Sequence, residues 1–234
     1  MEEEVFSGAL DPADKPSLFT RYLLVVLLVT LTSWLVSVVL LLPDRNQGLS
    51  ILVNEHLSLS GVRHPITAVL LNFRGYDTLL EMSVLLIALT GTWSLARPSE
   101  RIEAEPGLIL GFMVRLLIPL MIMVSGYLLW VGAHAPGGAF QAGSVLAASG
   151  VLLLLSGWRL SVRFVGWPLR TGLVLGLLVF IATGAAMLLI GNRFLEFPPS
   201  MAGNLILVIE ATATVSIAIT LTALFRGEQP DAKR

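Results

Sequence analysis

Long apolar runs leave this 234-residue chain few ways to fold. The hydrocarbon core of a bilayer is about 30 Å thick, and a helix needs roughly 20 apolar residues to cross it. Hydrophobic residues make up 55% of the chain and charged residues only 13%. We therefore predict an all-α integral membrane protein with about six transmembrane helices, at residues 19–42, 64–96, 107–130, 140–158, 168–190 and 201–225.

The second of these segments is longer than one span requires and contains the polar interruption NFRGYDTLLE. Two alternatives stay open: one continuous helix, or a helix broken near Gly75. A break would oblige the freed backbone groups to face protein or a water-filled cavity. Before this segment, the stretch NQGLSILVNEHLSLSG suits either a short strand pair or an interfacial helix.

The distribution of positive charge predicts the orientation in the membrane. Six spans place both termini on one side, and that side carries ten lysines and arginines against three on the other. Cytoplasmic loops are the ones enriched in these residues. We therefore predict a multi-pass protein of the cell (inner or plasma) membrane, with both termini in the cytoplasm and the loop HAPGG outside.

Charge also divides the chain along its length. The stretch RPSERIEAEP is the one strongly charged connection between predicted spans. The expected parts are an acidic cytoplasmic segment at 1–18, a two-span unit at 19–98, a charged linker at 99–106, a four-span unit at 107–226 and a tail at 227–234.

Several classes of function are disfavoured by what the sequence lacks. It contains no cysteine, which removes disulfides, thiolate nucleophiles and cysteine metal ligands. Its net charge of −1 argues against a nucleic-acid partner. Phosphate-loop, H-E-x-x-H and nucleophile-elbow motifs are missing, and the three histidines have no metal-binding spacing. We expect a protein that is not an enzyme and has neither a cofactor nor a metal.

Ionisable residues inside spans are the first candidates for function, because a charge in hydrocarbon is unfavourable unless it is paired or hydrated. Asp77 and Glu81 share a helix face at i, i+4, and Arg74 precedes Asp77 by three residues. Asp77 and Glu81 could accept protons or cations. The alternative for Arg74 and Asp77 is mutual neutralisation.

Two further ionisable residues lie deeper in predicted spans. Arg115 is about 12 Å along its helix at 1.5 Å per residue, and its favoured role is a counter-charge to a carboxylate. Glu210 lies near the middle of the last span and could serve an ion or proton path, or be held by a neighbouring helix or subunit.

The loop VGAHAPGGAFQAG between two spans permits a tight turn, because proline lacks a backbone N–H and glycine accepts positive φ. The free N–H groups of the helix that follows could instead contact an anionic group. A structural turn is the simpler interpretation. The motif consists of Gly132, His134, Pro136, Gly137, Gly138 and Phe140.

Residues 70–95, LLNFRGYDTLLEMSVLLIALTGTWSL, resemble the end of the large A subunit of Mrp-type cation/proton antiporters. In that family the pattern aspartate-phenylalanine-arginine-glycine-x-aspartate-threonine-x-glycine-glutamate opens a span. The departures are Asn72 for the usual acid and Leu80 for the usual glycine. The positions that match closely or identically are Asn72, Phe73, Arg74, Gly75, Asp77, Thr78 and Glu81.

The last four predicted spans resemble the MnhB-like B subunit of the same antiporters. Its signature is glycine-histidine-asparagine-x-proline-glycine-glycine-glycine-phenylalanine, which Gly132, Pro136, Gly137, Gly138 and Phe140 match. Ala133 takes the position of the family's histidine and His134 that of its asparagine, so the role of that histidine is not carried over.

This order of two modules implies a membrane subunit of a multisubunit complex that exchanges protons for Na⁺ or another monovalent cation. Its partners would be large antiporter-like subunits and small membrane subunits in the lipid bilayer. Asp77, Glu81 and Glu210 would serve the ion or proton path, with Arg74 and Arg115 tuning them. The alternative is an assembly subunit of a hydrogenase-type or other complex I-like complex, without an ion path of its own.

Overall fold

The computed structural model describes residues 17–41, 49–95, 107–158 and 164–227, with the side chains at 108–109 left aside. Within these ranges every regular element is a helix, which confirms the all-α prediction. The predicted linker at 99–106, the acidic segment up to residue 16 and the tail beyond Gly227 lie outside the described residues. The chain forms two compact units, Met1–Gly48 and Leu49–Arg234, which are described separately.

The first unit contains one described helix, α1 (Leu18–Leu40). Ser17 caps its start by accepting a hydrogen bond from the backbone N–H of Thr20. The hydroxyls of Thr30 and Ser37 donate to carbonyls of the same helix, those of Val26 and Trp34. These two hydroxyls are therefore satisfied by the backbone of their own helix, as polar groups in hydrocarbon need to be.

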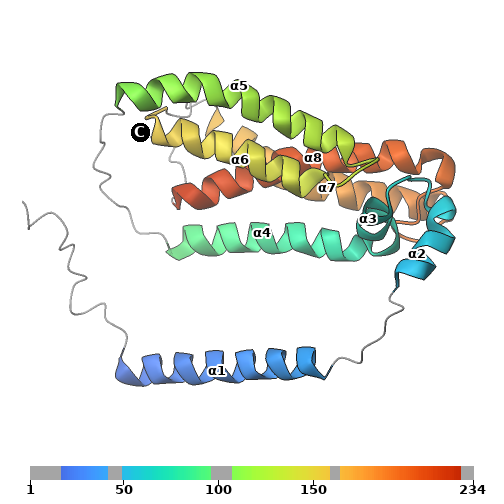
Figure 1. Ribbon diagram of the computed structural model, residues 1–234, viewed down its shortest axis with the longest axis horizontal. Helices are drawn as coiled ribbons and strands as arrows, with labels where there is room; N and C mark the ends of the chain where they lie inside the picture. The colour runs from blue at the N-terminus through green and yellow to red at the C-terminus, as the bar shows by residue number, and fades with distance from the viewer. Residues whose placement is uncertain (1–16, 42–48, 96–106, 159–163, 228–234) are drawn as a thin grey trace, which may run out of the picture. The chain divides into compact units, whose positions relative to one another are not determined.

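The second unit is a helical bundle (Figure 1). Helices α4, α5, α7 and α8 are, with α1, long and apolar enough to cross a membrane, and α6 is a shorter apolar helix. Together they correspond to the six predicted spans. The elements are α2 (Ser50–His56), η2 (Leu57–Ser60), α3 (Pro65–Ala68), η3 (Val69–Phe73), α4 (Gly75–Leu95), α5 (Leu108–Val131), α6 (Ala139–Leu155), α7 (Trp167–Leu189) and α8 (Pro199–Arg226).

The second predicted span is broken at its polar stretch, so of the two alternatives the helix broken near Gly75 is the one observed. A π-helical turn, η3, ends at Arg74, whose φ of −127° and ψ of 35° leave the helical region, and α4 begins at Gly75. Before it, residues 50–60 form α2 and η2, so the helical alternative holds there and the strand pair does not.

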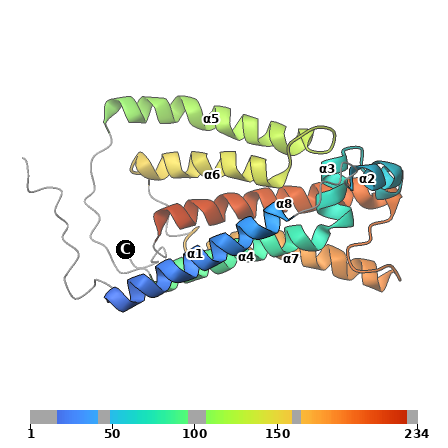
Figure 2. The ribbon, with the colours of Figure 1, turned by 60° about the horizontal axis from the view of Figure 1, so that its bottom comes forward.

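Helix α8 is the centre of the second unit, with α6, α7 and α4 packed around it and α5 lying on α6 (Figure 2). Small residues allow the close approach. A Cβ atom on Gly143 of α6 would stand 2.9 Å from the Ile217 side chain, and one on Gly176 of α7 would stand 2.8 Å from the Ala213 Cα. The side of α8 that faces these neighbours is therefore buried along its length.

Candidate functional site

Among the described residues, Glu210 is the carboxylate that the bundle encloses most completely. It lies on α8 with 5% of its surface exposed. The backbone N–H of Ala139, in the first turn of α6, donates a hydrogen bond to it. The N-terminal end of a helix carries partial positive charge, so an anion is favoured there. The anionic group that the sequence allowed at this helix end is thus supplied by the chain itself.

Two features of Gly138 limit which residue can occupy its position. A Cβ atom at Gly138 would stand 2.7 Å from Oε1 of Glu210, closer than real Cβ atoms come to a neighbour. Its φ of +107° with ψ of −170° is also open to glycine and strained for other residues. The backbone conformation therefore favours glycine at the start of α6, and a larger residue would also displace the end of the Glu210 side chain.

The rest of the loop is folded against the end of α5. The backbone N–H of Gly138 donates to the carbonyl of Leu128 at 3.0 Å, and the N–H of His134 to that of Val131 at 2.8 Å. A Cβ atom on Gly132 would meet the Gly138 nitrogen at 2.6 Å, and one on Gly137 the Leu128 oxygen at 2.5 Å. The loop is thus a tight turn, and at Gly132 and Gly137 it has no room for a larger residue.

A hydrogen bond fixes this loop to a distant part of the chain. The buried hydroxyl of Thr67, on α3, donates to the carbonyl of Gly132 at 2.6 Å. Phe140, at the other end of the motif, is half-buried against the bundle core. His134 and Pro136 remain exposed. The loop is therefore held from both sides, and its exposed face carries the histidine.

A pocket of about 310 Å³ reaches Glu210. Its walls come from the link between η2 and α3, the loop between α5 and α6, and the first half of α8. Arg63 and Asn204, both exposed, stand at its outer part. The polar residues among its lining are Arg63, Thr67, His134, Asn204 and Glu210.

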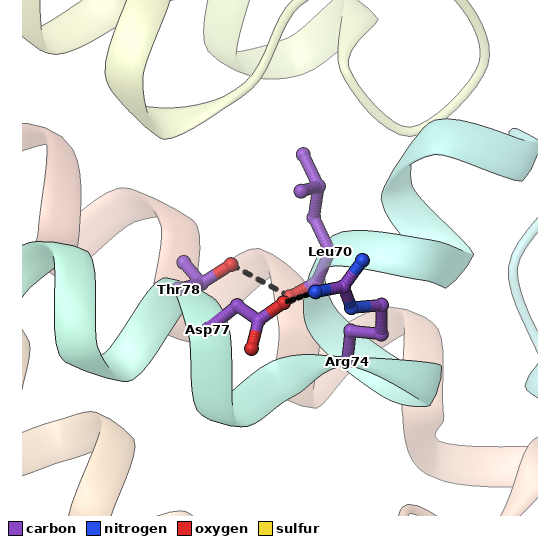
Figure 3. A network of polar contacts seen from close by, with 4 residues as sticks. All are labelled: Leu70, Arg74, Asp77 and Thr78. Atoms are coloured by element: carbon purple, nitrogen blue, oxygen red, sulfur yellow. Dashed lines mark hydrogen bonds and ion pairs between the residues drawn. The ribbon is translucent and has the colours of Figure 1, made fainter. Parts of the chain in front are cut away.

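A second polar group lies at the start of α4 (Figure 3). The Arg74 guanidinium pairs with the Asp77 carboxylate, and these side chains are 62% and 45% exposed. The Thr78 hydroxyl donates to the carbonyl of Leu70 in η3 at 2.7 Å, and the Asn72 amide donates to the Ser60 carbonyl at 2.8 Å. Side chains thus stabilise the break, and Arg74 and Asp77 pair as the spacing suggested.

Glu81 and Arg115 lie apart from both groups. Each is exposed, Glu81 on α4 and Arg115 on α5. Neither forms an ion pair with another residue in the described part of the chain. Arg115 therefore lacks the carboxylate partner expected for it within these residues. Asp77 and Glu81 share the outward side of α4, whereas Glu210 is turned into the bundle.

The sequence indicates the loop and Glu210 as two separate features and does not indicate that they are in contact. The residues that complete the site, Thr67 on α3 and Ala139 at the first turn of α6, carry no ionisable group and gave no signal of their own. The nearest signal was the loop motif itself, whose free helix N-terminus suits an anion.

Comparison with protein families gives a match over just over half of the chain. The matching family is described as a domain related to the MnhB subunit of Na⁺/H⁺ antiporter, and the match covers residues 109–226. These residues contain α6, α7 and α8 and nearly all of α5, and thus both the loop motif and Glu210.

One curated relative and two solved structures are similar. The relative, from Rhizobium meliloti (strain 1021), is described as the A/B subunit of a probable K(+)/H(+) antiporter; it is 28% identical over 169 residues, which cover 58% of this chain and 16% of that protein. The chain thus spans about a sixth of that relative's length. A chain of the membrane-bound sulfane sulfur reductase, an archaeal respiratory membrane complex, matches with a TM-score of 0.67 and 22% identity, covering 91% of this chain and 99% of that one. A chain of the Mrp complex from Dietzia sp. DQ12-45-1b matches with a TM-score of 0.65 and 19% identity, covering 94% and 27%.

Proposed function

Because this chain belongs to the family of domains related to the MnhB subunit of Na⁺/H⁺ antiporters, we propose that it is a membrane subunit of a multisubunit cation/proton antiporter. Its partners would be large antiporter-like subunits and other small membrane subunits. The exchanged ions would be protons and Na⁺ or another monovalent cation. The complex would lie in the cell membrane, with both termini of this chain in the cytoplasm.

The observation that carries this proposal is the buried carboxylate of Glu210 on the central helix of a membrane bundle. A carboxylate in such a place is unfavourable unless it is stabilised, and ionisable residues in spans commonly mark ion or proton pathways. We assign Glu210 to such a path on this chain.

Asp77 and Glu81 would serve the path at a boundary with a neighbouring subunit. Glu81 is exposed on a helix apolar enough to span the membrane, so in the bilayer it needs a polar or charged neighbour. Arg74 would tune Asp77 through their ion pair, and Arg115 would act on a carboxylate of a partner.

Substitution of Glu81 by Gln in the whole complex tests the proposal, since it removes the charge and retains the shape. We expect the complex to assemble and cation-driven proton flux in vesicles to fall about a hundredfold or more, the typical contribution of one positioned proton-transfer group. The matched control is Glu55→Gln on α2, an exposed carboxylate outside the spans. Unchanged flux in Glu81→Gln, or loss of assembly alone, would contradict the ionic role.

An assembly subunit without its own path is the second candidate. It is favoured by the mutual neutralisation of Arg74 and Asp77, which gives these two charges a sufficient structural explanation. In this case the chain would hold neighbouring subunits of a respiratory or hydrogenase-type membrane complex together. Co-purification decides between these settings, because redox subunits would accompany the chain in a respiratory complex and not in an antiporter.

A further inference from the structure

The pocket at Glu210 has room for water along a sizeable length of α8. Its wall on this helix extends from Gly203 to Glu210, which is about 10 Å at 1.5 Å per residue. One water takes about 30 Å³ in the liquid, so a volume of about 310 Å³ admits several. Polar side chains at Arg63, His134 and Asn204 give such waters hydrogen-bond partners.

The inner end of the pocket is a carboxylate that can exist with or without a proton. As an anion, Glu210 is favoured by the N-terminus of α6 and by the Ala139 N–H. As a neutral acid, it still accepts from that N–H and can donate its own proton to a water. Both forms therefore have a hydrogen-bond partner at this site.

Few charged groups compete for this carboxylate. Besides Glu210, the ionisable residues lining the pocket are Arg63 of the η2–α3 link and His134 of the α5–α6 loop. Helix α6 carries no ionisable residue. Helix α7 carries Arg170 in its first turn, α5 carries the exposed Arg115, and α4 carries Asp77 and Glu81, none of which lines the pocket.

We propose that this pocket is an aqueous route by which protons reach Glu210 from the side of the membrane where the α5–α6 loop lies. A proton needs one carboxylate oxygen and a chain of waters, whereas a dehydrated metal cation needs a set of oxygens to replace its hydration shell. Across the described residues, no three His, Asp or Glu side chains are grouped to hold a metal ion. The inference rests on the proposed function, since only a transporting complex would carry the proton onward from Glu210.

Single cysteines test the route directly, because the native chain has none. Leu207 lines the pocket, and its neighbour Val208 is exposed elsewhere on α8 and does not line it. Leu207→Cys and Val208→Cys thus form a pair at nearly the same depth. Pro136→Cys, on the exposed loop, marks the side of the membrane.

The assembled complex in sealed vesicles would be treated with a charged, membrane-impermeant methanethiosulfonate reagent, and labelled peptides of this chain identified by mass. We expect Leu207→Cys to react from the same side as Pro136→Cys and about tenfold or more faster than Val208→Cys, since the reactive thiolate forms in water and not in hydrocarbon. Equal rates at Leu207→Cys and Val208→Cys, or reaction of Leu207→Cys from the opposite side only, would overturn the route.

The identity of the ion is tested at Glu210 by an apolar carbodiimide, which modifies protonated carboxyl groups. We expect modification of the Glu210 peptide to decrease as pH rises and to be unchanged when choline is replaced by Na⁺ at constant pH. Protection by Na⁺ would mean that the site takes a metal cation and would overturn the proton assignment. Glu210→Gln gives the background. Neither labelling experiment requires flux, so loss of the proposed antiport function would be recognised separately, by the Glu81→Gln measurement.

Discussion

The two polar groups of the second unit differ in what completes them. Glu210 is 5% exposed, and it is satisfied within the chain by the start of α6. At the start of α4, Arg74 and Asp77 are 62% and 45% exposed and pair with each other, while Glu81 stands outward without an ion partner among the described residues. The first group is an interior site whose hydrogen-bond partner comes from the same chain. The second has the form of one side of an interface, because exposed charge on a spanning helix requires a polar neighbour.

The largest expected effect comes from closing the space beside Glu210. Gly138→Ala adds a Cβ atom 2.7 Å from the carboxylate at a residue with φ of +107°. We expect the free energy of unfolding of the full chain in detergent to fall by about 3 kcal/mol, from backbone strain together with displacement of a buried, hydrogen-bonded carboxyl group.

Gly166→Ala is the matched control for this change. Gly166 also precedes a helix and has φ of +101°, but no atom lies within 4 Å of the position that its Cβ would take. It should show the backbone strain alone, about 1 kcal/mol. Equal losses in Gly138→Ala and Gly166→Ala would mean that contact with Glu210 contributes nothing to the stability of this site.

A somewhat smaller effect is expected where α6 packs on α8. Gly143→Ala places a Cβ atom 2.9 Å from Ile217 and 3.1 Å from the Thr214 carbonyl oxygen, so it should lower the free energy of unfolding by about 1–3 kcal/mol. Gly126→Ala on α5, with open space around the new methyl, should be neutral or slightly stabilising. Chemical denaturation of the full chain measures both. A neutral Gly143→Ala would show that the interior site does not depend on close approach of α6.

At the start of α4, loss of one hydrogen bond should have a modest effect. Thr78→Val removes the bond to the Leu70 carbonyl across the break, and we expect a loss of about 1 kcal/mol. Thr90→Val is the control, because its exposed hydroxyl bonds only to the carbonyl three residues earlier in the same helix. Both are measured by chemical denaturation. Equal free energies of unfolding for Thr78→Val and Thr90→Val would contradict the stabilising role of Thr78.

The smallest effect is expected for the exposed ion pair. Arg74→Gln should change the stability of the full chain by less than about 1 kcal/mol, because surface ion pairs are weakened by water and by side-chain entropy. Within the assembled complex the same change should act on flux, if a partner covers this face. If Arg74→Gln lowered the free energy of unfolding of the chain alone by several kcal/mol, the start of α4 would be important for the stability of this chain, and its contrast with the Glu210 site would be wrong.

Local features of the sequence were enough to predict the spans, and they left a break near Gly75 as one of two alternatives. Apolar length identified the membrane helices, and the polar residues around Gly75 indicated the interruption that the structure places at Arg74. The fourth span was less well delimited. It was expected at 140–158, but α6 ends at Leu155, followed by Gly157 with φ of +77°, which interrupts the apolar run.

The meeting of Glu210 with Gly138 was beyond sequence reasoning. It depends on how α6 lies along α8, and that close approach is allowed by small residues such as Gly143 and Gly150, where the atoms nearest to an added Cβ belong to α8. The sequence showed a helix end suited to an anion and a carboxylate in need of stabilisation. Nothing local indicated that each satisfies the other.

The contacts of α4 bear on how such a chain could arise. Although a charged connection separates α4 from α5 in the sequence, α4 packs on α7 and α8, and Thr67 just before it bonds to Gly132 just after α5. Two polypeptides severed between residues 99 and 106 would retain these complementary surfaces and could reassemble in the bilayer. In evolution, joining or separating the corresponding genes would then change the number of chains without altering the bundle from α4 to α8.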